Sequence, residues 1–276
     1  MLISVITINY NNKTGLTDTI NSVKSQNFKD FEYIVIDGDS SDGSKGIVEA
    51  NKAHFAYCTS EKDSGIYNAM NKGIRASNGK YLLFLNSGDT LDNETILENS
   101  SKYLKTDKDI YFGNLELVHE TTREIVRYPD ELSFNFFFNK GHIPHPSSFI
   151  KKSLFNEVYM YKEKFKIVSD WDFFVCAICK HNASYLHIDQ VISNYATDGI
   201  SGDPKYVQLL QNERAQSIKD NFPLFIDEAK RLVEYDKKFK LNRFKMLNVL
   251  EENSMAQKMN SIWLTLLAKL FRKPSK

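Results

Sequence analysis

Asn86-Ser87-Gly88-Asp89 follows the apolar run Tyr81-Leu82-Leu83-Phe84-Leu85, and this stretch decides the fold. A short, continuous apolar run bounded by glycines predicts a strand buried in a parallel sheet. Open α/β sheets bind ligands beyond the carboxyl ends of such strands. At that position Gly88 allows a phosphate to approach the backbone, and Asp89 offers a hard oxygen ligand to Mg²⁺ or Mn²⁺. Taken alone, the same residues are more often a turn before a helix.

Three further strands are predicted upstream, at residues 3–8, 31–36 and 55–58, and an amphipathic segment at residues 16–23 separates the first two. Strands that alternate with helix-length segments indicate right-handed crossovers and a mainly parallel sheet. Each predicted strand is followed by polar, acidic or glycine-rich residues. We therefore expect an α/β fold with its chemistry collected along one edge of the sheet.

As an ordered set, these motifs resemble those of the family 2 glycosyltransferases, and specifically the members that build bacterial surface polysaccharides. The resemblance covers roughly residues 1–202. It is carried by residues 4–11, 22–26, 31–38, 63–73, 79–89, 145–149 and 169–173.

The resemblance implies the GT-A nucleotide-diphospho-sugar transferase fold, with a mainly parallel central sheet flanked by helices. It places the catalytic domain at residues 1–204, with a nucleotide-binding half (1–107) and an acceptor-binding half (108–204). Residues 109–115 and 123–128 read as a hairpin in the second half. Residues 205–276 are expected to form a basic, helical C-terminal extension.

The resemblance also assigns the nucleotide site to Thr7, Asn9, Tyr10, Asp37, Asp39, Asp63, Lys72 and Ser87. A buried uracil has an N–H donor that needs an acceptor, and a carboxylate meets this need strongly. Gly38 stands where the family more often has a second aspartate. For this reason Asp37 and Asp39 are equally interpretable as Asx-turn residues. Lys72 is alternatively interpretable as a solvated surface lysine.

Asp89 corresponds to the second acid of the family's metal motif, with Ser87 at the first acidic position. This makes Asp89 the expected ligand for Mn²⁺ or Mg²⁺, together with the donor's phosphates. Asp170 corresponds to the catalytic base of an inverting transfer, and Ser169 replaces the acid before it. The alternative for Asp170 is a helix-cap role. The resemblance assigns three further residues to the acceptor or to a phosphate: His145, Trp171 and Ser201. Ser201 belongs to a loop that we expect to close over the donor.

Other enzyme classes are disfavoured by motifs that the sequence lacks. No Gly-x-Gly-x-x-Gly follows the first strand, and no Gly-Lys-Ser/Thr phosphate loop occurs. The resemblance implies a glycosyltransferase that moves a sugar from a nucleoside-diphosphate sugar, UDP-linked in our interpretation, to a saccharide or lipid-linked acceptor. The remaining alternative is a non-catalytic nucleotide- or saccharide-binding protein on the same fold, which would not need Asp170.

The composition is that of an ordinary globular protein, with 276 residues, 42% of them apolar and 26% charged. Cys176 and Cys179 are spaced like metal ligands, but they lack a second pair and read as helix-core residues. Met1 leads directly into the first strand without a signal-like segment. A reducing cytoplasm is the expected compartment.

The charge is distributed unevenly. Residues 205–276 hold 15 Lys and Arg against 8 Asp and Glu, whereas residues 1–204 hold 21 against 27. The basic part has no nucleic-acid-binding signature, so we expect no nucleic-acid partner. Residues 262–273 are apolar with a basic end, and too short to span a bilayer. They predict an interfacial helix on an anionic membrane, or alternatively a surface for the protein's own domain or a second subunit in a homo-oligomer.

Overall fold

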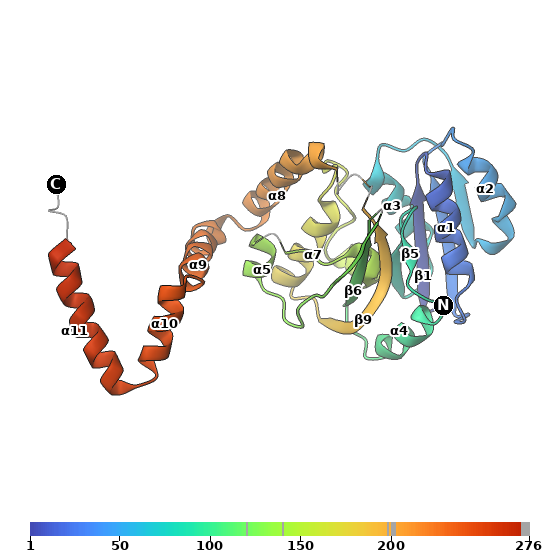
Figure 1. The fold of residues 1–276 in the computed structure, drawn as a ribbon. Coiled ribbons are helices and arrows are strands. Elements are labelled where there is room, and N and C mark those ends of the chain that lie inside the picture. The colour runs from blue at the N-terminus through green and yellow to red at the C-terminus, as the bar shows by residue number, and fades with distance from the viewer. Residues whose placement is uncertain (120, 140, 198, 200–202, 272–276) are drawn as a thin grey trace. The chain divides into compact units, whose positions relative to one another are not determined.

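The computed structural model describes residues 1–119, 121–139, 141–197, 199 and 203–271 (Figure 1). Its strands are β1 (Ile3–Asn9), β2 (Phe31–Asp37), β3 (Tyr57–Ser60), β4 (Tyr81–Phe84), β5 (Thr90–Leu91), β6 (Ile110–Val118), β7 (Arg123–Val126), β8 (Ser148–Lys151) and β9 (Tyr185–Ala196). Its α-helices are α1 (Lys13–Lys24), α2 (Ser44–Ala50), α3 (Ile66–Ala76), α4 (Ile96–Leu104), α5 (Phe134–Phe138), α6 (Leu154–Glu157), α7 (Ser169–Cys179), α8 (Val207–Asn221), α9 (Ile226–Phe239), α10 (Asn242–Glu251) and α11 (Ser254–Phe271).

The strands of the described residues form one sheet in the order β3-β2-β1-β4-β8-β6-β9-β5, with β7 paired to β6. The first four strands in this order are parallel, as predicted. Beyond β4 the sheet is mixed: β8 is antiparallel to β4 and β6, β7 forms a hairpin with β6, and β9 runs parallel to β6. The carboxyl ends of β1, β2 and β4 therefore meet along one edge.

Helices cover both faces of the parallel part of the sheet (Figure 1). On one face, Val5 of β1 packs in the main core with Leu16 and Ile20 of α1. On the other face α3 approaches so closely that a Cβ on Gly73 would lie 2.4 Å from Ile6 Cγ2. Successive strand residues point to opposite faces, so Val5 and Ile6 place α1 and α3 on opposite sides.

An aromatic cluster fixes α7 on the same face as α3. Phe173 of α7 stacks on Phe155 with ring centroids 4.5 Å apart, and it meets Tyr161 edge-on at 5.6 Å. Tyr161 in turn packs against Phe84 of β4 at 5.5 Å. Aromatic pairs of this kind add to the free energy already gained by burying the rings. The start of α7 is thereby brought to the edge where β4 ends.

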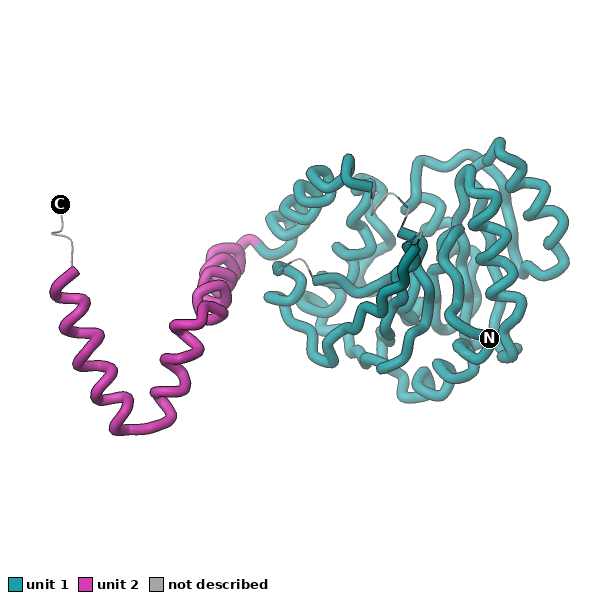
Figure 2. Tube along the Cα trace, in the orientation of Figure 1, with its two compact units in different colours: residues 1–222 teal, residues 223–276 magenta. Residues whose placement is uncertain are grey.

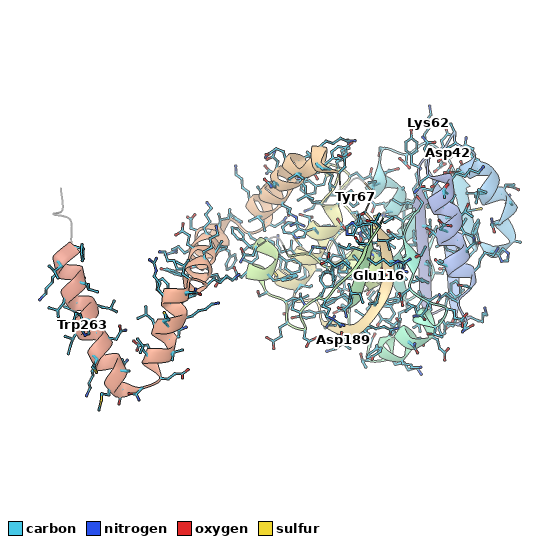
Figure 3. All side chains as sticks on the ribbon, in the orientation of Figure 1. Asp42, Lys62, Tyr67, Glu116, Asp189 and Trp263 are labelled. Carbon is cyan, nitrogen blue, oxygen red and sulfur yellow. The ribbon has the colours of Figure 1, made fainter. Side chains whose placement is uncertain are left out.

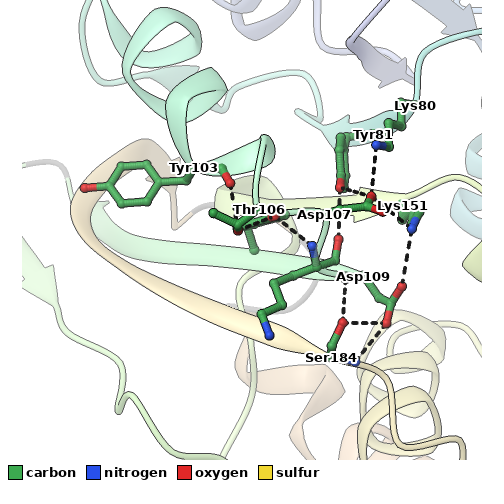
Figure 4. Close-up of polar contacts among 10 residues, drawn as sticks. Lys80, Tyr81, Tyr103, Thr106, Asp107, Asp109, Lys151 and Ser184 are labelled. Carbon is green, nitrogen blue, oxygen red and sulfur yellow. Dashed lines mark hydrogen bonds and ion pairs between the residues drawn. The ribbon is translucent and has the colours of Figure 1, made fainter.

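A polar network ties the strands together at the opposite edge, where β4, β6 and β9 begin (Figure 4). Asp107 pairs with Lys80 Nζ at 2.9 Å and with Lys151 Nζ at 3.1 Å. Asp109 accepts hydrogen bonds from the backbone and hydroxyl of Ser184. These charges serve the scaffold, because the predicted site residues lie at the other edge.

The chain forms two compact units, Met1–Phe222 and Pro223–Lys276 (Figure 2). The sequence places the boundary after residue 204, but α8 belongs to the first unit. Ser217, Ile218 and Phe222 are buried, and Phe222 packs on Phe134 with ring centroids 4.9 Å apart. The boundary therefore lies beyond α8, because one face of that helix is part of the core.

The second unit consists of η4 (Pro223–Phe225) and helices α9 to α11. Ala229 is its one buried residue among those described, and large apolar side chains such as Trp263 stand out from α11 (Figure 3). Over the described ranges, no helix has both the length and the apolar character required to cross a membrane. A unit this small with so little buried surface gains little stability from a core of its own.

Candidate active site

Asp170 lies in the first turn of α7 and is held by two hydrogen bonds. His145 Nδ1 lies 3.0 Å from Asp170 Oδ2, and the Tyr67 hydroxyl of α3 donates to Oδ1 at 2.8 Å. The Asp170 side chain is 19% exposed, so it retains access to solvent. Burial raises the pKa of Asp170, but the hydrogen bonds from His145 and Tyr67 and the charge of His145 outweigh it, and the pKa lies below its usual value. Asp170 is therefore ionised and oriented.

His145 begins the short 3₁₀ helix η2 (His145–Ser147) and lies between two acids. Burial lowers the pKa of His145, but its hydrogen bond to Asp170 and the charges of Asp170 and Asp89 raise it above the usual value. The Asp89 and Asp170 carboxylates thus act on the same imidazole. This arrangement brings together three of the predicted site residues: Asp89, His145 and Asp170.

Asn86 connects this imidazole to the end of β4. The Asn86 amide nitrogen lies 3.1 Å from His145 Nε2, while the buried Asn86 Oδ1 has no hydrogen-bond partner among the described residues. A neutral His145 that donates from Nδ1 can accept from Asn86 at Nε2. A protonated His145 would instead donate from Nε2, and a rotated Asn86 amide would supply Oδ1 as the acceptor. Asn86 therefore suits both protonation states.

Asp89 lies in the tight turn after β4, which Gly88 permits by adopting a φ of +107°. Thr19 of α1 holds this turn: its hydroxyl accepts from Gly88 N at 3.0 Å and donates to Asp89 O at 2.7 Å. The buried Asp89 carboxylate accepts from Ala196 N at 3.4 Å. The turn thus fixes a hard oxygen ligand beside the carboxyl end of β4.

Tyr10, Gly38 and Asp63 come together where β1 and β2 end. A Cβ on Gly38 would lie 2.6 Å from Asp63 Oδ2 and 3.2 Å from Tyr10 Cδ2. The Tyr10 side chain is 68% exposed. Asp63 Oδ1 accepts from Gly65 N at 2.9 Å, which fixes the carboxylate in its loop. The missing side chain of Gly38 leaves an exposed aromatic ring next to a carboxylate.

Asp37, which the resemblance assigns to the nucleotide site, is enclosed by its own loops. It is fully buried, and it accepts from Asn9 Nδ2 at 2.7 Å, from the Ser60 hydroxyl at 2.5 Å, and from the Ser40 hydroxyl and backbone N–H at 2.6 and 3.0 Å. These contacts favour a structural role for Asp37, whose backbone donor Ser40 lies three residues further along the chain. Asn9, which donates to Asp37, is also buried, and its Oδ1 has no hydrogen-bond partner among the described residues.

The other predicted nucleotide residues have diverse partners. Thr7 is fully buried, donating to Leu85 O at 2.8 Å and contacting the Tyr33 hydroxyl at 3.0 Å. Asp39 forms an ion pair with Lys45. Lys72 pairs with Glu61 at 2.8 Å and thereby supports the loop that carries Asp63. Ser87 anchors its loop through its backbone, since Ser87 N donates to Ile8 O and Ser87 O accepts from Asn12 Nδ2.

Trp171, which the resemblance assigns to the acceptor side, packs inside the protein. It is buried, its indole N–H donates to Gly141 O at 2.8 Å, and the Arg214 guanidinium lies 4.9 Å from its ring centroid. A ring packed in this way supports α7. Ser201 lies outside the described residues, as does most of the loop expected to close over the donor.

Sequence reasoning missed Tyr67 of α3 and Arg214 of α8, which both act on Asp170. The helical spacing of Tyr67 predicts a core residue. Its ring is buried as predicted, but its hydroxyl donates to Asp170. Arg214 lies beyond the expected catalytic domain, and its charge acts on Asp170. No local pattern reveals either contact, because both depend on how distant helices pack.

Residues 4–162 match glycosyl transferase family 2. The chain belongs to this family. The predicted resemblance and the GT-A fold are confirmed, and the chain is a glycosyltransferase. The family match ends before Asp170, so the position of that residue rests on the geometry described above.

Among relatives, the chain is 34% identical over 181 residues to the uncharacterized glycosyltransferase Rv1514c of Mycobacterium tuberculosis, covering 63% of this chain and 68% of that protein. It is 25% identical over 203 residues to a PGL/p-HBAD biosynthesis glycosyltransferase of Mycobacterium bovis, covering 70% and 76%. Among solved structures, the fold resembles residues 1–349 of Staphylococcus aureus TarS in complex with UDP-GlcNAc. The TM-score is 0.63 at 20% identity, over 80% of this chain and 68% of that one.

Proposed function

We propose that this glycosyltransferase transfers a sugar from a UDP-sugar, with inversion, to a saccharide or lipid-linked saccharide of a bacterial surface polysaccharide. The observation that carries the proposal is the ionised Asp170, fixed by His145 and Tyr67 at the edge where β4 presents Asp89. The structure of TarS with UDP-GlcNAc supports the choice of a UDP-sugar. A protein that only bound nucleotide or saccharide would have no need for an oriented base.

In the proposed reaction, Asp170 removes the proton of the acceptor hydroxyl as that oxygen bonds to the anomeric carbon of the donor. The bond from that carbon to the diphosphate breaks, and UDP leaves with its electron pair. His145 stabilises the negative charge of Asp170 before the transfer, and its Nε2 is occupied by Asn86. Asp170 is therefore the base, and His145 holds it in place.

We assign the metal site to Asp89. Across the described residues no group of three or more His, Cys, Asp or Glu side chains is arranged to hold a metal ion. One buried carboxylate fits an ion that arrives with the donor's phosphates, because Mg²⁺ commonly binds one or two carboxylates plus substrate phosphates. Bound there, Mn²⁺ or Mg²⁺ would stabilise the diphosphate leaving group.

We assign the base slot to Tyr10 and Asp63. The exposed Tyr10 ring offers a surface for stacking. Asp63 Oδ2 lies where a side chain at position 38 would otherwise stand, so it can accept from a base N–H. Asp37, Asn9, Lys72 and Ser87 hold the surrounding loops, and Asp39 contributes a surface ion pair.

The metal-dependent binding of UDP tests the assignment of the metal site to Asp89. Calorimetry with and without Mn²⁺ should show metal-dependent UDP binding for the wild type and its loss for Asp89→Ala. Asp18→Ala, an exposed acid on α1, is the control and should bind like the wild type. Hydrolysis of a panel of UDP-sugars would then identify the donor. Equal UDP affinity for Asp89→Ala and wild type, with and without Mn²⁺, would remove Asp89 from the metal site.

We further propose that α11 binds an anionic membrane on its cytoplasmic face, close to a lipid-linked acceptor. Trp263 and Leu270 are exposed, at 63% and 76%. Residues 254–276 contain five Lys and Arg and no Asp or Glu. Such a helix would repel its own copy but attract anionic headgroups, at about 1 kcal/mol for each cation near the surface.

Liposome sedimentation tests the membrane proposal. The wild type should bind anionic vesicles, bind less at high salt, and ignore neutral vesicles. The double variant Trp263→Ala/Phe271→Ala should bind several-fold less, whereas Met246→Ala, an exposed side chain on α10, should bind like the wild type. A wild type that ignores anionic vesicles, or a double variant that instead dissociates an oligomer, would favour a protein partner for α11.

A further inference from the structure

Side chains of α8, a helix outside the family match, hold the first turn of α7 in place. Asp172 is fully buried, and α8 supplies two of its partners. Asp172 Oδ1 accepts from the Ser217 hydroxyl at 2.5 Å and from Asn221 Nδ2 at 3.2 Å. Asp172 Oδ2 accepts from the Tyr159 hydroxyl at 2.7 Å and pairs with Lys162 Nζ at 2.9 Å. Both carboxylate oxygens are thus satisfied, as a buried charge requires.

Glu213, also on α8, holds the segment that leads into α7. Its two carboxylate oxygens accept from Lys166 N at 2.7 Å and from Ile167 N at 2.9 Å. These N–H groups lie just before the first helical residue, Ser169. A carboxylate that accepts from two successive N–H groups fixes the backbone more firmly than one hydrogen bond does.

Arg214 of α8 adds a third contact to α7: its guanidinium lies over the ring of Trp171, with Cζ 4.9 Å from the ring centroid. Trp171 and Asp172 directly follow Asp170 in the same helical turn. Successive residues of an α-helix point about 100° apart around its axis. When the directions of residues 171 and 172 are fixed by α8, the direction of Asp170 toward His145 and Tyr67 is fixed as well.

We propose that α8 is a positioning element of the active site, with Ser217 and Glu213 as its positioning residues. They act through Asp172 and the entry to α7, and they touch no substrate. The proposal rests on the proposed role of Asp170 as the base. It predicts that loosening α8 slows the chemical step while donor binding, on the other side of the site, stays intact.

Ser217→Ala is the test, with Gln216→Ala as its control. Gln216 is the neighbouring residue and makes an exposed hydrogen bond to Asp220. The substrate is whichever of UDP-glucose, UDP-galactose, UDP-GlcNAc and UDP-glucuronic acid the wild type hydrolyses fastest. Ser217→Ala should lower kcat about 10-fold, since misplacing a reacting group by 1 Å can cost 10²-fold. KM and the Kd for UDP should stay within about twofold of wild type, and Gln216→Ala should match wild type throughout.

A double-mutant cycle separates positioning from general weakening of the fold. In an Asp170→Asn background, Ser217→Ala should cause no further loss of kcat, because the group it positions is gone. Should Ser217→Ala fold poorly, Glu213→Ala and Glu213→Gln replace it, and the loss should be smaller for Gln, which retains an acceptor.

Two results would overturn the inference: an unchanged kcat for both Ser217→Ala and Glu213→Ala, or a full additional loss in the Asp170→Asn background. If Asp170→Asn itself keeps wild-type turnover, the proposed base is wrong and the inference fails with it. An inactive Asp170→Asn combined with an unaffected Ser217→Ala would reject the positioning role alone.

Discussion

The carboxyl end of β2 and the first turn of α7 each present an aspartate at a predicted site, yet the two differ in how far the protein encloses them. Asp37 is fully buried and accepts four hydrogen bonds from three residues of its surroundings. Asp170 accepts two and remains 19% exposed. In both cases burial raises the pKa and hydrogen bonds outweigh it, so both pKa values lie below the usual one. Exposure, and not the direction of the pKa shift, separates Asp37 from Asp170, the proposed base.

The largest effect expected from this comparison is on stability. Asp37→Asn should lower the free energy of unfolding by about 3 kcal/mol, because an amide N–H₂ would face the donors of Asn9, Ser40 and Ser60. Urea unfolding measures it. Asp39→Asn, which removes an exposed ion pair with Lys45, should cost less than about 1 kcal/mol. Similar small losses for both variants would contradict the structural role of Asp37.

The pair of His145 and Asp170 should make stability depend on pH. The contribution of His145 is complete below its unfolded pKa of 6.5 and is lost as pH rises through its higher folded value. The contribution of Asp170 is present above 3.8 and is lost as pH falls through its lower folded value. The pair therefore stabilises the fold most between about pH 4 and 6.5.

Unfolding of the wild type and His145→Gln at about pH 5.5 and 8.5 measures this effect. The advantage of the wild type should shrink by about 1–2 kcal/mol at the higher pH, the range for a hydrogen bond to a charged group. His54→Gln, an exposed histidine, is the control and should track the wild type. An advantage that is constant, or larger at high pH, would show that His145 is neutral in the folded protein.

The smallest effect is expected at Tyr10, on the open side of the site. Tyr10→Ala should weaken UDP binding by about 1 kcal/mol, at the low end for base–aromatic stacking, whereas Tyr10→Phe should bind normally. Tyr103→Ala removes another exposed tyrosine ring, on α4, and should have no effect. Unchanged UDP affinity for Tyr10→Ala would place the base elsewhere.

The sequence predicted the parallel strands β1, β2 and β4, because apolar runs and strand ends are local signals. The assignment of Asp89, His145 and Asp170 to one site came from the family resemblance. The sequence did not reveal that Thr7, Asp37 and Trp171 are buried, because a motif gives a position along the chain but not the number of internal partners that enclose a side chain. It also ended the catalytic domain before α8. That helix is mostly polar, and only its packing against Asp172 and Trp171 shows where it belongs.

The central claim, that Asp170 is an accessible base separate from the donor site, is tested most directly by measuring UDP affinity and donor hydrolysis on one preparation of Asp170→Asn. We predict a Kd for UDP within about twofold of wild type and a fall in turnover of about 10²-fold or more, the scale for losing a general base. Turnover near the wild-type rate would contradict the claim and leave Asp170 with a structural role in the first turn of α7.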